Sequence, residues 1–263
     1  MKFIKLVLIL LLIISGVILT ESFASLKLKN INQITQSLKV EPNNSETKTQ
    51  KPQLIKNYAY YDYELNFEKE ELLFHSNLEE LAFSKQKIQN LNCKFMTNAG
   101  FYTEKKSHIG LFKQNNKIIS QQIRHNLFDS FVGFNNSSKE FYIGKKAQVE
   151  KYENIFQTGP MLFNNGKIQK LKLKNDNNAR RIVVAQTNEN KIYFVTFFDS
   201  KLKTSGPLLN DLPTLLQEYA KLKGIKILNA TNLDGGNHSF FMSGNQNLPE
   251  LSKAGGFVCA KAR

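Results

Sequence analysis

Residues 181–198, RIVVAQTNENKIYFVTFF, decide which fold class this chain can adopt. Residues 181–185 and 191–198 are rich in β-branched and aromatic side chains, which favour extended strands. The residues between them, 187–190, read Thr-Asn-Glu-Asn and are typical of a polar turn. Two strands joined by so short a connection must pair antiparallel, so this stretch predicts a β-hairpin.

Two other stretches repeat the pattern. Residues 109–119 hold apolar runs on either side of Gln-Asn-Asn, and residues 161–168 hold Asn-Asn-Gly between Met-Leu-Phe and Lys-Ile. Asn-Gly is a strong hairpin signal because both turn residues tolerate positive φ. These stretches predict two further antiparallel pairs.

Helical patterning is clearest in residues 211–223, where leucines and a tyrosine recur at helical spacing. Asp211 is the predicted N-cap, the glycine after the last turn ends the helix, and a strand over 225–230 should follow. Residues 76–90 form a second predicted helix, capped by Ser76. A few helices among hairpins, without strict alternation, predict an α+β fold, a single domain with a mixed or antiparallel sheet, rather than a doubly wound one.

The amino-terminal residues resemble a secretory leader. Lys2 and Lys5 precede the apolar run 6–19, which is short for a membrane span but suits a signal peptide. Cleavage after Ala24 and retention as a membrane anchor through residues 4–19 are the two alternatives. Both place the rest of the chain outside the cytoplasm, because the lysines hold the amino terminus inside.

The next residues are polar and lack a convincing hydrophobic period, which predicts a linker without its own core. We therefore divide the chain into a signal peptide or membrane anchor, a flexible polar linker, and one folded domain: residues 1–24, 25–56 and 57–263.

The composition excludes several classes of protein. The 263 residues are 41% hydrophobic and carry a formal net charge of +14, but the lysines are spread among asparagines without a long basic run. No nucleic-acid-binding module is recognisable, so no nucleic-acid partner is expected. The two cysteines exclude a disulfide-dense scaffold or a thiol–zinc cluster. Cys93 and Cys259 are either disulfide-bonded or two buried free thiols.

Four segments carry residue types that suit a chemical site at strand ends. The fourth, residues 232–239 (NLDGGNHS), is the most informative, because two glycines after an aspartate let a ligand approach the backbone. The alternative is a tight turn in which the aspartate bonds its own backbone. The other three are residues 97–102 (TNAGFY), residues 158–163 (TGPMLF), and the hairpin that opens at Arg180-Arg181 and ends at Asp199.

Taken in order, these four segments and the 211–223 helix resemble the phosphodiester glycosidase family over roughly residues 58–263. The resemblance implies a carbohydrate or sugar-phosphate substrate and two groups of site residues. The catalytic candidates are Asp234, Asp199, Arg180 and Arg181, and the substrate-binding candidates are Asn98, Gly100, Gly159, Gly235, Gly236, His238 and Ser239.

Each role follows from the chemistry of the bond between a sugar and a phosphodiester. An arginine, Arg180 or Arg181, would bind the phosphate with its forked donors. Asp234 would act as nucleophile or as the base for water, with Asp199 as the alternative carboxylate. His238 stands where the family usually has a hydroxyl residue. It is either a proton donor or a turn residue packed on Phe240 or Phe241.

The resulting expectation is an exported hydrolase that cleaves a sugar-1-phosphodiester in envelope or extracellular polysaccharide. The alternative is an inactive protein of the same fold that binds carbohydrate or assists exopolysaccharide processing. No cofactor is required by this chemistry. A structural calcium ion bound by aspartate and backbone oxygens is left open.

Overall fold

The hairpin predicted over 181–198 lies at the centre of a seven-stranded sheet in the computed structural model, which describes residues 51–263. All neighbouring strands of this sheet pair antiparallel. In spatial order the strands are β1 (Gln53–Ile55), β2 (Tyr58–Leu65), β13 (Ile192–Phe198), β12 (Arg181–Thr187), β14 (Ile227–Asn232), β10 (Met161–Asn164) and β11 (Lys167–Ile168).

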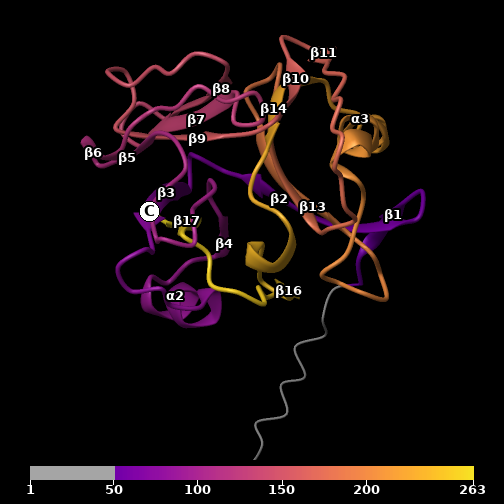
Figure 1. Cartoon of the computed structure of the whole chain (residues 1–263), viewed down its shortest axis with the longest axis horizontal. Coiled ribbons are helices and arrows are strands. Elements are labelled where there is room, and N and C mark those ends of the chain that lie inside the picture. The colour runs from indigo at the N-terminus through magenta and orange to yellow at the C-terminus, as the bar shows by residue number, and fades with distance from the viewer. Residues whose placement is uncertain (1–50) are drawn as a thin grey trace, which may run out of the picture. The chain divides into compact units, whose positions relative to one another are not determined.

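Helix α3 (Leu212–Lys223) covers one face of this sheet (Figure 1). Its apolar stripe packs on the strands, with Leu216 and Tyr219 in one cluster with Val183 of β12. Gly224 ends the helix in the left-handed conformation, at φ 65°, as the sequence predicts. Asp211 stands at the N-cap position, but its side chain makes no capping hydrogen bond, because the short 3-10 helix η1 (Leu209–Asp211) leads directly into α3.

Two five-stranded sheets complete the domain, and both are antiparallel throughout. The first has the order β16 (Gln246–Leu248), β15 (Phe241–Ser243), β4 (Phe95–Asn98), β17 (Gly256–Ala262) and β3 (Glu70–Ser76). The second has the order β6 (Lys117–Ser120), β5 (Phe112–Gln114), β9 (Asn154–Thr158), β7 (Ser130–Asn135) and β8 (Glu140–Gly144).

The main core lies where the three sheets meet. One buried cluster takes Phe95 from the first five-stranded sheet, Phe156 from the second and Phe194 from the seven-stranded sheet. Aromatic contacts link these layers; the rings of Phe95 and Phe194, for example, are 4.9 Å apart. The predicted α+β class with one domain is therefore confirmed, and within residues 51–263 the sheets are antiparallel with two α-helices.

The second predicted helix is wrong at its start. Ser76 is the last residue of β3 and pairs with Gly256 of β17, so it cannot cap a helix. Helix α2 (Ser84–Asn90) begins eight residues later. There, the Ser84 N–H donates to the carboxylate of Glu250 at 2.5 Å, a partner 166 residues away that local pattern does not reveal.

The amino-terminal boundary also differs from the expectation. Strand β1 lies in the stretch expected to be linker, and it pairs with β2. The apolar run at residues 6–19 lies outside the described residues. Among residues 51–263, no helix is both long enough and apolar enough to cross a membrane.

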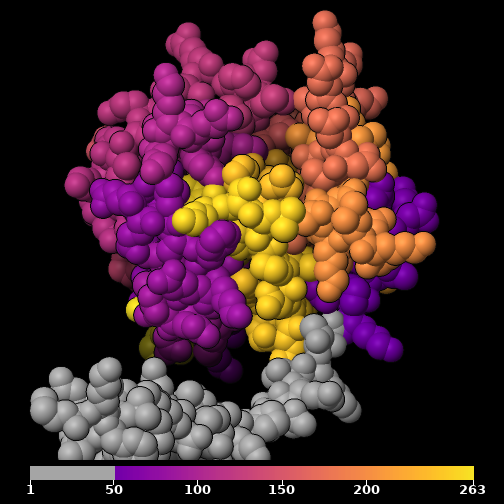
Figure 2. Space-filling view, turned by 60° about the horizontal axis from the view of Figure 1, so that its bottom comes forward, coloured from indigo at the N-terminus to yellow at the C-terminus, as the bar shows by residue number. Residues whose placement is uncertain are grey.

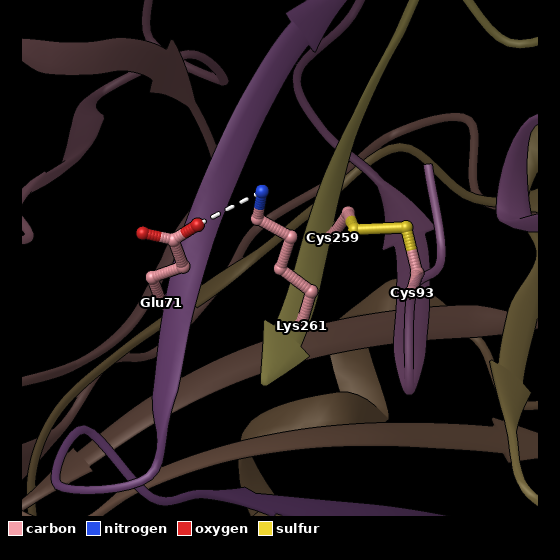
Figure 3. The surroundings of a disulfide bond; sticks show 4 residues. All are labelled: Glu71, Cys93, Cys259 and Lys261. Atoms are coloured by element: carbon pink, nitrogen blue, oxygen red, sulfur yellow. Dashed lines mark ion pairs between the residues drawn. A yellow bond between two sulfur atoms is a disulfide. The ribbon is translucent and has the colours of Figure 1, made fainter. Parts of the chain in front are cut away.

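A disulfide joins Cys93 to Cys259, which decides between the two alternatives left by the sequence (Figure 3). The bond ties the segment before β4 to strand β17, across 166 residues of sequence. Beside it, Lys261 pairs with Glu71 of β3 at 2.9 Å, so β17 is fastened to both of its neighbours.

We expect loss of this disulfide to lower the free energy of unfolding by about 2–4 kcal/mol, because the cross-link restricts a long loop in the unfolded chain. Urea unfolding of the C93S/C259S variant, compared with the wild type, measures the effect. Dithiothreitol should bring the wild type to the midpoint of the variant and leave the variant unchanged. An unchanged wild-type midpoint after both thiols have been titrated as free would contradict this expectation.

Candidate active site

The Asp-Gly-Gly segment follows strand β14 and is bound to two other segments. The backbone N–H of Asp234 donates to the carbonyl of Ala99, just after β4, at 3.4 Å. The N–H of Gly236 donates to the carbonyl of Arg180, just before β12, at 2.9 Å. The turn therefore sits at the junction of the seven-stranded sheet and the first five-stranded sheet, and the short 3-10 helix η2 (Gly236–His238) follows it.

Asn98, at the end of β4, holds both sides of this turn. Its side-chain Nδ2 donates to the carbonyl of Asp234 at 2.7 Å, and its Oδ1 accepts the N–H of Phe240 at 3.1 Å. Asn98 is 1% exposed, so both polar atoms are committed to the protein. The structure thus brings Asn98 to the candidate site but uses its amide to position Asp234.

The glycines permit close backbone approaches. A Cβ on Gly235 would lie 2.9 Å from the carbonyl oxygen of Arg180, which leaves no room for a side chain. A Cβ on Gly100 would lie 2.7 Å from the carbonyl oxygen of Gln157. Gly159 lies behind the turn, where its N–H donates to the carbonyl of Asn232 at 3.2 Å. Gly100 and Gly159 therefore serve packing between strands that support the site.

The two arginines have different surroundings. Arg180 is 1% exposed, and its Nε donates to Ser239 Oγ at 2.8 Å. Its Nη2 donates to the carbonyls of Ser239 and Pro249, and its Nη1 to the carbonyl of Lys203. Burial lowers the pKa of Arg180 to about 10. Ser239 is also fully buried and donates its hydroxyl to the Gly236 carbonyl at 2.6 Å, so this pair holds the loop after Asp234 together.

Arg181 is the arginine that acts on Asp234. Its Nη2 forms an ion pair with Asp176 at 3.2 Å and donates to the carbonyl of Asn177 at 2.6 Å. Its Nε donates to the carbonyl of Pro207. Burial lowers the pKa of Arg181, and the negative charges of Asp176 and Asp234 oppose that shift. The guanidinium therefore lends positive charge to Asp234 while the protein occupies several of its donors.

Asp234 is the titratable group whose pKa is most suited to acid–base chemistry. Burial raises its pKa to about 7, although the nearby His238, the Gly235 N–H and Arg181 all favour the charged form. A carboxyl that changes protonation near neutral pH can take a proton from water and release it again. The Asp-Gly-Gly turn places the Asp234 carboxyl in the surroundings that raise its pKa.

His238 is held by a tyrosine and a backbone carbonyl. Its Nδ1 lies 2.7 Å from the hydroxyl of Tyr102 and 3.2 Å from the carbonyl oxygen of Lys253, and the two rings meet edge to face at 5.2 Å. The Tyr102 hydroxyl also donates to the Lys253 carbonyl. Since that carbonyl can only accept, the network assigns a proton to Nδ1, and Nε2 lies outside this network.

This contact differs from the packing on Phe240 or its neighbour that was one expectation for His238. Tyr102 was not among the candidate residues, although it belongs to the quoted segment TNAGFY, and that segment was the available signal. Burial, followed by the charge of Asp234, raises the pKa of Tyr102 to about 12. Lys253 carries no motif that would have identified it.

Asp199 is not drawn into this network. Its Oδ1 accepts the N–H groups of Lys201 and Leu202, both at 2.8 Å, in its own turn. These bonds lower the pKa of Asp199. Within residues 51–263, no group of three or more His, Cys, Asp and Glu side chains is arranged to hold a metal ion.

The raised pKa of Asp234 has a consequence for stability. Between its unfolded pKa of 3.8 and its folded pKa of about 7, the folded chain keeps a proton that the unfolded chain loses, so stability falls as pH rises through this window. The D234N variant has no carboxyl at this position, so it does not lose this stability as the pH rises. We expect its Tm to exceed that of the wild type at pH 8 by at least about 2 °C, a shift typical of 1 kcal/mol in a domain of this size.

The difference in Tm between D234N and the wild type should shrink as the pH approaches 4, where the wild-type carboxyl becomes protonated in both the folded and the unfolded chain. D199N is the matched comparison: because the pKa of Asp199 is lowered, its substitution should reduce rather than raise the Tm at pH 8. Thermal unfolding followed by circular dichroism checks both. Equal Tm values for D234N and wild type at pH 8 would contradict the raised pKa of Asp234.

Comparisons with known proteins identify the family of this chain. A family model described as phosphodiester glycosidase matches residues 91–256, a range that includes Asn98, Arg181, Asp234 and His238. A search of curated proteins gave no significant match.

Two solved structures have the same fold at low sequence identity. The catalytic domain of zebrafish N-acetylglucosamine-1-phosphodiester α-N-acetylglucosaminidase superposes with a TM-score of 0.57 and 12% identity, covering 82% of this chain and 87% of that one. A protein of Synechocystis superposes with a TM-score of 0.62 and 11% identity, covering 81% of this chain. This chain spans 61% of the Synechocystis protein. Because the family model covers more than half of the sequence, the chain belongs to the phosphodiester glycosidase family.

Proposed function

We propose that this protein is a hydrolase that cleaves the glycosidic bond between the anomeric carbon of a sugar and a phosphodiester. The observation that carries the proposal is the half-buried Asp234 carboxyl, with its pKa raised to about 7, on a glycine turn beside Arg181 and His238. Family membership supports the reaction class. A phosphate leaves readily, so the main demands are to stabilise positive charge on the sugar ring and to activate water.

Asp234 meets both demands. Its carboxylate, once deprotonated, stabilises the positive charge on the ring and acts as nucleophile or as base for the attacking water. Asn98 and the Arg180–Ser239 pair are positioning groups, because their polar atoms bind the turn on either side of Asp234. His238, with Nδ1 anchored, offers Nε2 for proton exchange.

The disulfide supports an extracytoplasmic location, since such bonds persist in oxidising compartments. Together with the apolar run at 6–19, it favours an exported protein, either released after Ala24 or attached to the membrane through residues 4–19. An envelope or extracellular polysaccharide that contains sugar-phosphate linkages is the substrate that such a location would supply.

One observation favours a second candidate, an inactive carbohydrate-binding or exopolysaccharide-processing protein of the same fold. Asn98, Arg180 and Ser239 all use their polar atoms within the protein, which leaves fewer groups for a substrate. His238 also replaces the hydroxyl residue usual in the family. A turnover assay separates the two candidates.

We expect the full chain to release free sugar from at least one member of a panel of methyl sugar-1-phosphodiesters. D234N should lower kcat/KM by about 10²- to 10⁴-fold, the range for a positioned acid–base group. D211N is the matched control, because Asp211 is exposed and its side chain caps no helix. D234N with the wild-type rate would contradict the proposed role, and binding of a sugar without turnover would favour the second candidate.

The pH profile provides a separate check. Because the deprotonated carboxylate is the active form, kcat/KM should rise with pH and level off above about 7. Measurements from pH 5 to 9 on the best substrate would show this limb. A rate that falls through pH 7 would instead make Asp234 a proton donor.

A further inference from the structure

A pocket of about 370 Å³ opens beside the Tyr102–His238 pair. The groups that bear on its chemistry are the side chains of Tyr102, Thr103, Lys106, His238, Ser252 and Lys253. The charge of Asp234 raises the pKa of Tyr102, and His238 acts electrostatically on Asp234, so the pocket adjoins the candidate active site. On the face shown in Figure 2, the carboxy-terminal residues, in yellow, lie between the purple early segments and the orange segment.

The lining carries more positive than negative charge. Lys106 and Lys253 contribute two ammonium groups, against one carboxylate from Glu104. Among the ion pairs of residues 51–263, neither lysine has a partner. Lys253 Nζ lies 5.4 Å over the ring of Phe83, a contact that leaves its donors available. Two unpaired ammonium groups at one pocket attract an anion.

The other groups suit a tetrahedral oxyanion. Ser252 supplies a hydroxyl that can donate to a phosphate oxygen, and the Thr103 hydroxyl, which lies 2.8 Å from Ser107 Oγ and accepts the Ser107 N–H, adds a second polar group. His238 has Nδ1 committed to Tyr102 and the Lys253 carbonyl, so Nε2 is the ring nitrogen left for a ligand.

Arg180 and Arg181 leave the binding of the phosphate to other side chains. Arg180 directs its donors to the carbonyls of Lys203, Ser239 and Pro249 and to a buried hydroxyl. Arg181 is engaged by Asp176 and by two backbone carbonyls. The side chains that the sequence offered for phosphate binding are thus largely occupied inside the protein, whereas the lysines at the pocket are not.

We propose that this pocket, here called the lysine pocket, is the subsite for the phosphate side of the substrate and retains the phosphate monoester product. The inference rests on the proposed function. In the reaction, the hydroxyl of water bonds to the anomeric carbon, and the electron pair of the breaking C–O bond leaves with the phosphate. The proton of water passes to the Asp234 carboxylate and then to solvent. The sugar lies at the Asp-Gly-Gly turn and the phosphate monoester in the lysine pocket.

Binding of glycerol 3-phosphate, a simple phosphate monoester, tests the subsite without turnover. Calorimetric titration of the full chain should give saturable binding that K106Q and K253Q each weaken by about tenfold, the loss of one hydrogen bond to a charged group. K105Q is the matched control, because Lys105 is an exposed neighbour outside the pocket and should leave affinity unchanged. Equal affinities for the three variants and the wild type would overturn the proposal.

Nuclear magnetic resonance locates the ligand independently. The chain has four histidines. Glycerol 3-phosphate should shift the ring resonances of one of them, His238, assigned by their loss in H238N. Shifts confined to another histidine would overturn the proposal.

Failure of the two proposals can be told apart. Phosphate binding that depends on Lys106 and Lys253, without turnover of any diester, would support the subsite and contradict the hydrolase. Turnover that depends on Asp234, with phosphate affinity insensitive to both lysines, would support the hydrolase and overturn the subsite.

Discussion

The hydrogen bonds from one buried amide, Asn98, are the constraint on which the rest of the site depends. Its Nδ2 binds the carbonyl of Asp234 and its Oδ1 binds the N–H of Phe240, so strand β4 holds the turn from both sides. Desolvation raises the pKa of the Asp234 carboxyl, and the bonds from Asn98 hold the backbone that carries this carboxyl in place. The three sheets supply that frame, since the turn lies where two of them meet.

The arginine pair shows how adjacent residues take separate tasks. Successive residues of a strand point to opposite faces. Arg180, just before β12, is buried against the loop after the turn, and Arg181, the first residue of β12, lends positive charge to Asp234. Arg180 thus holds the loop after Asp234 in place. The positive charge of Arg181 favours the ionised form of the Asp234 carboxyl. In the proposed lysine pocket, the positive charge for an anionic substrate would come from Lys106 and Lys253, which stand at the surface.

Local patterns predicted much of the fold, and distant pairings account for what they missed. The Asn-Asn-Gly turn at 164–166 formed its hairpin because its residues accept positive φ without help from the rest of the chain. The helix at 211–223 likewise follows from its own apolar stripe. Helix α2 was misplaced because Ser76 belongs to a strand paired with Gly256, and β1 was missed because it is a short edge strand.

The residues of the candidate site also divide into those that a local sequence pattern predicted and those whose roles depend on distant contacts. The Asp-Gly-Gly turn was found because two glycines after an aspartate are unusual in sequence. The uses of Arg180 and Ser239 depend on a contact across 59 residues, which no local pattern contains. Tyr102 could have been selected from its segment, but its bond to His238 could not, since it joins residues 136 apart.

The central claim is that Asp234 titrates near neutral pH in the folded chain. The most direct measurement is the pH titration of its side-chain carboxyl carbon by nuclear magnetic resonance, with D234N used to assign the signal. The account predicts a midpoint near the value of about 7 that burial produces. A midpoint below about 5, in the ordinary range of aspartate, would contradict it.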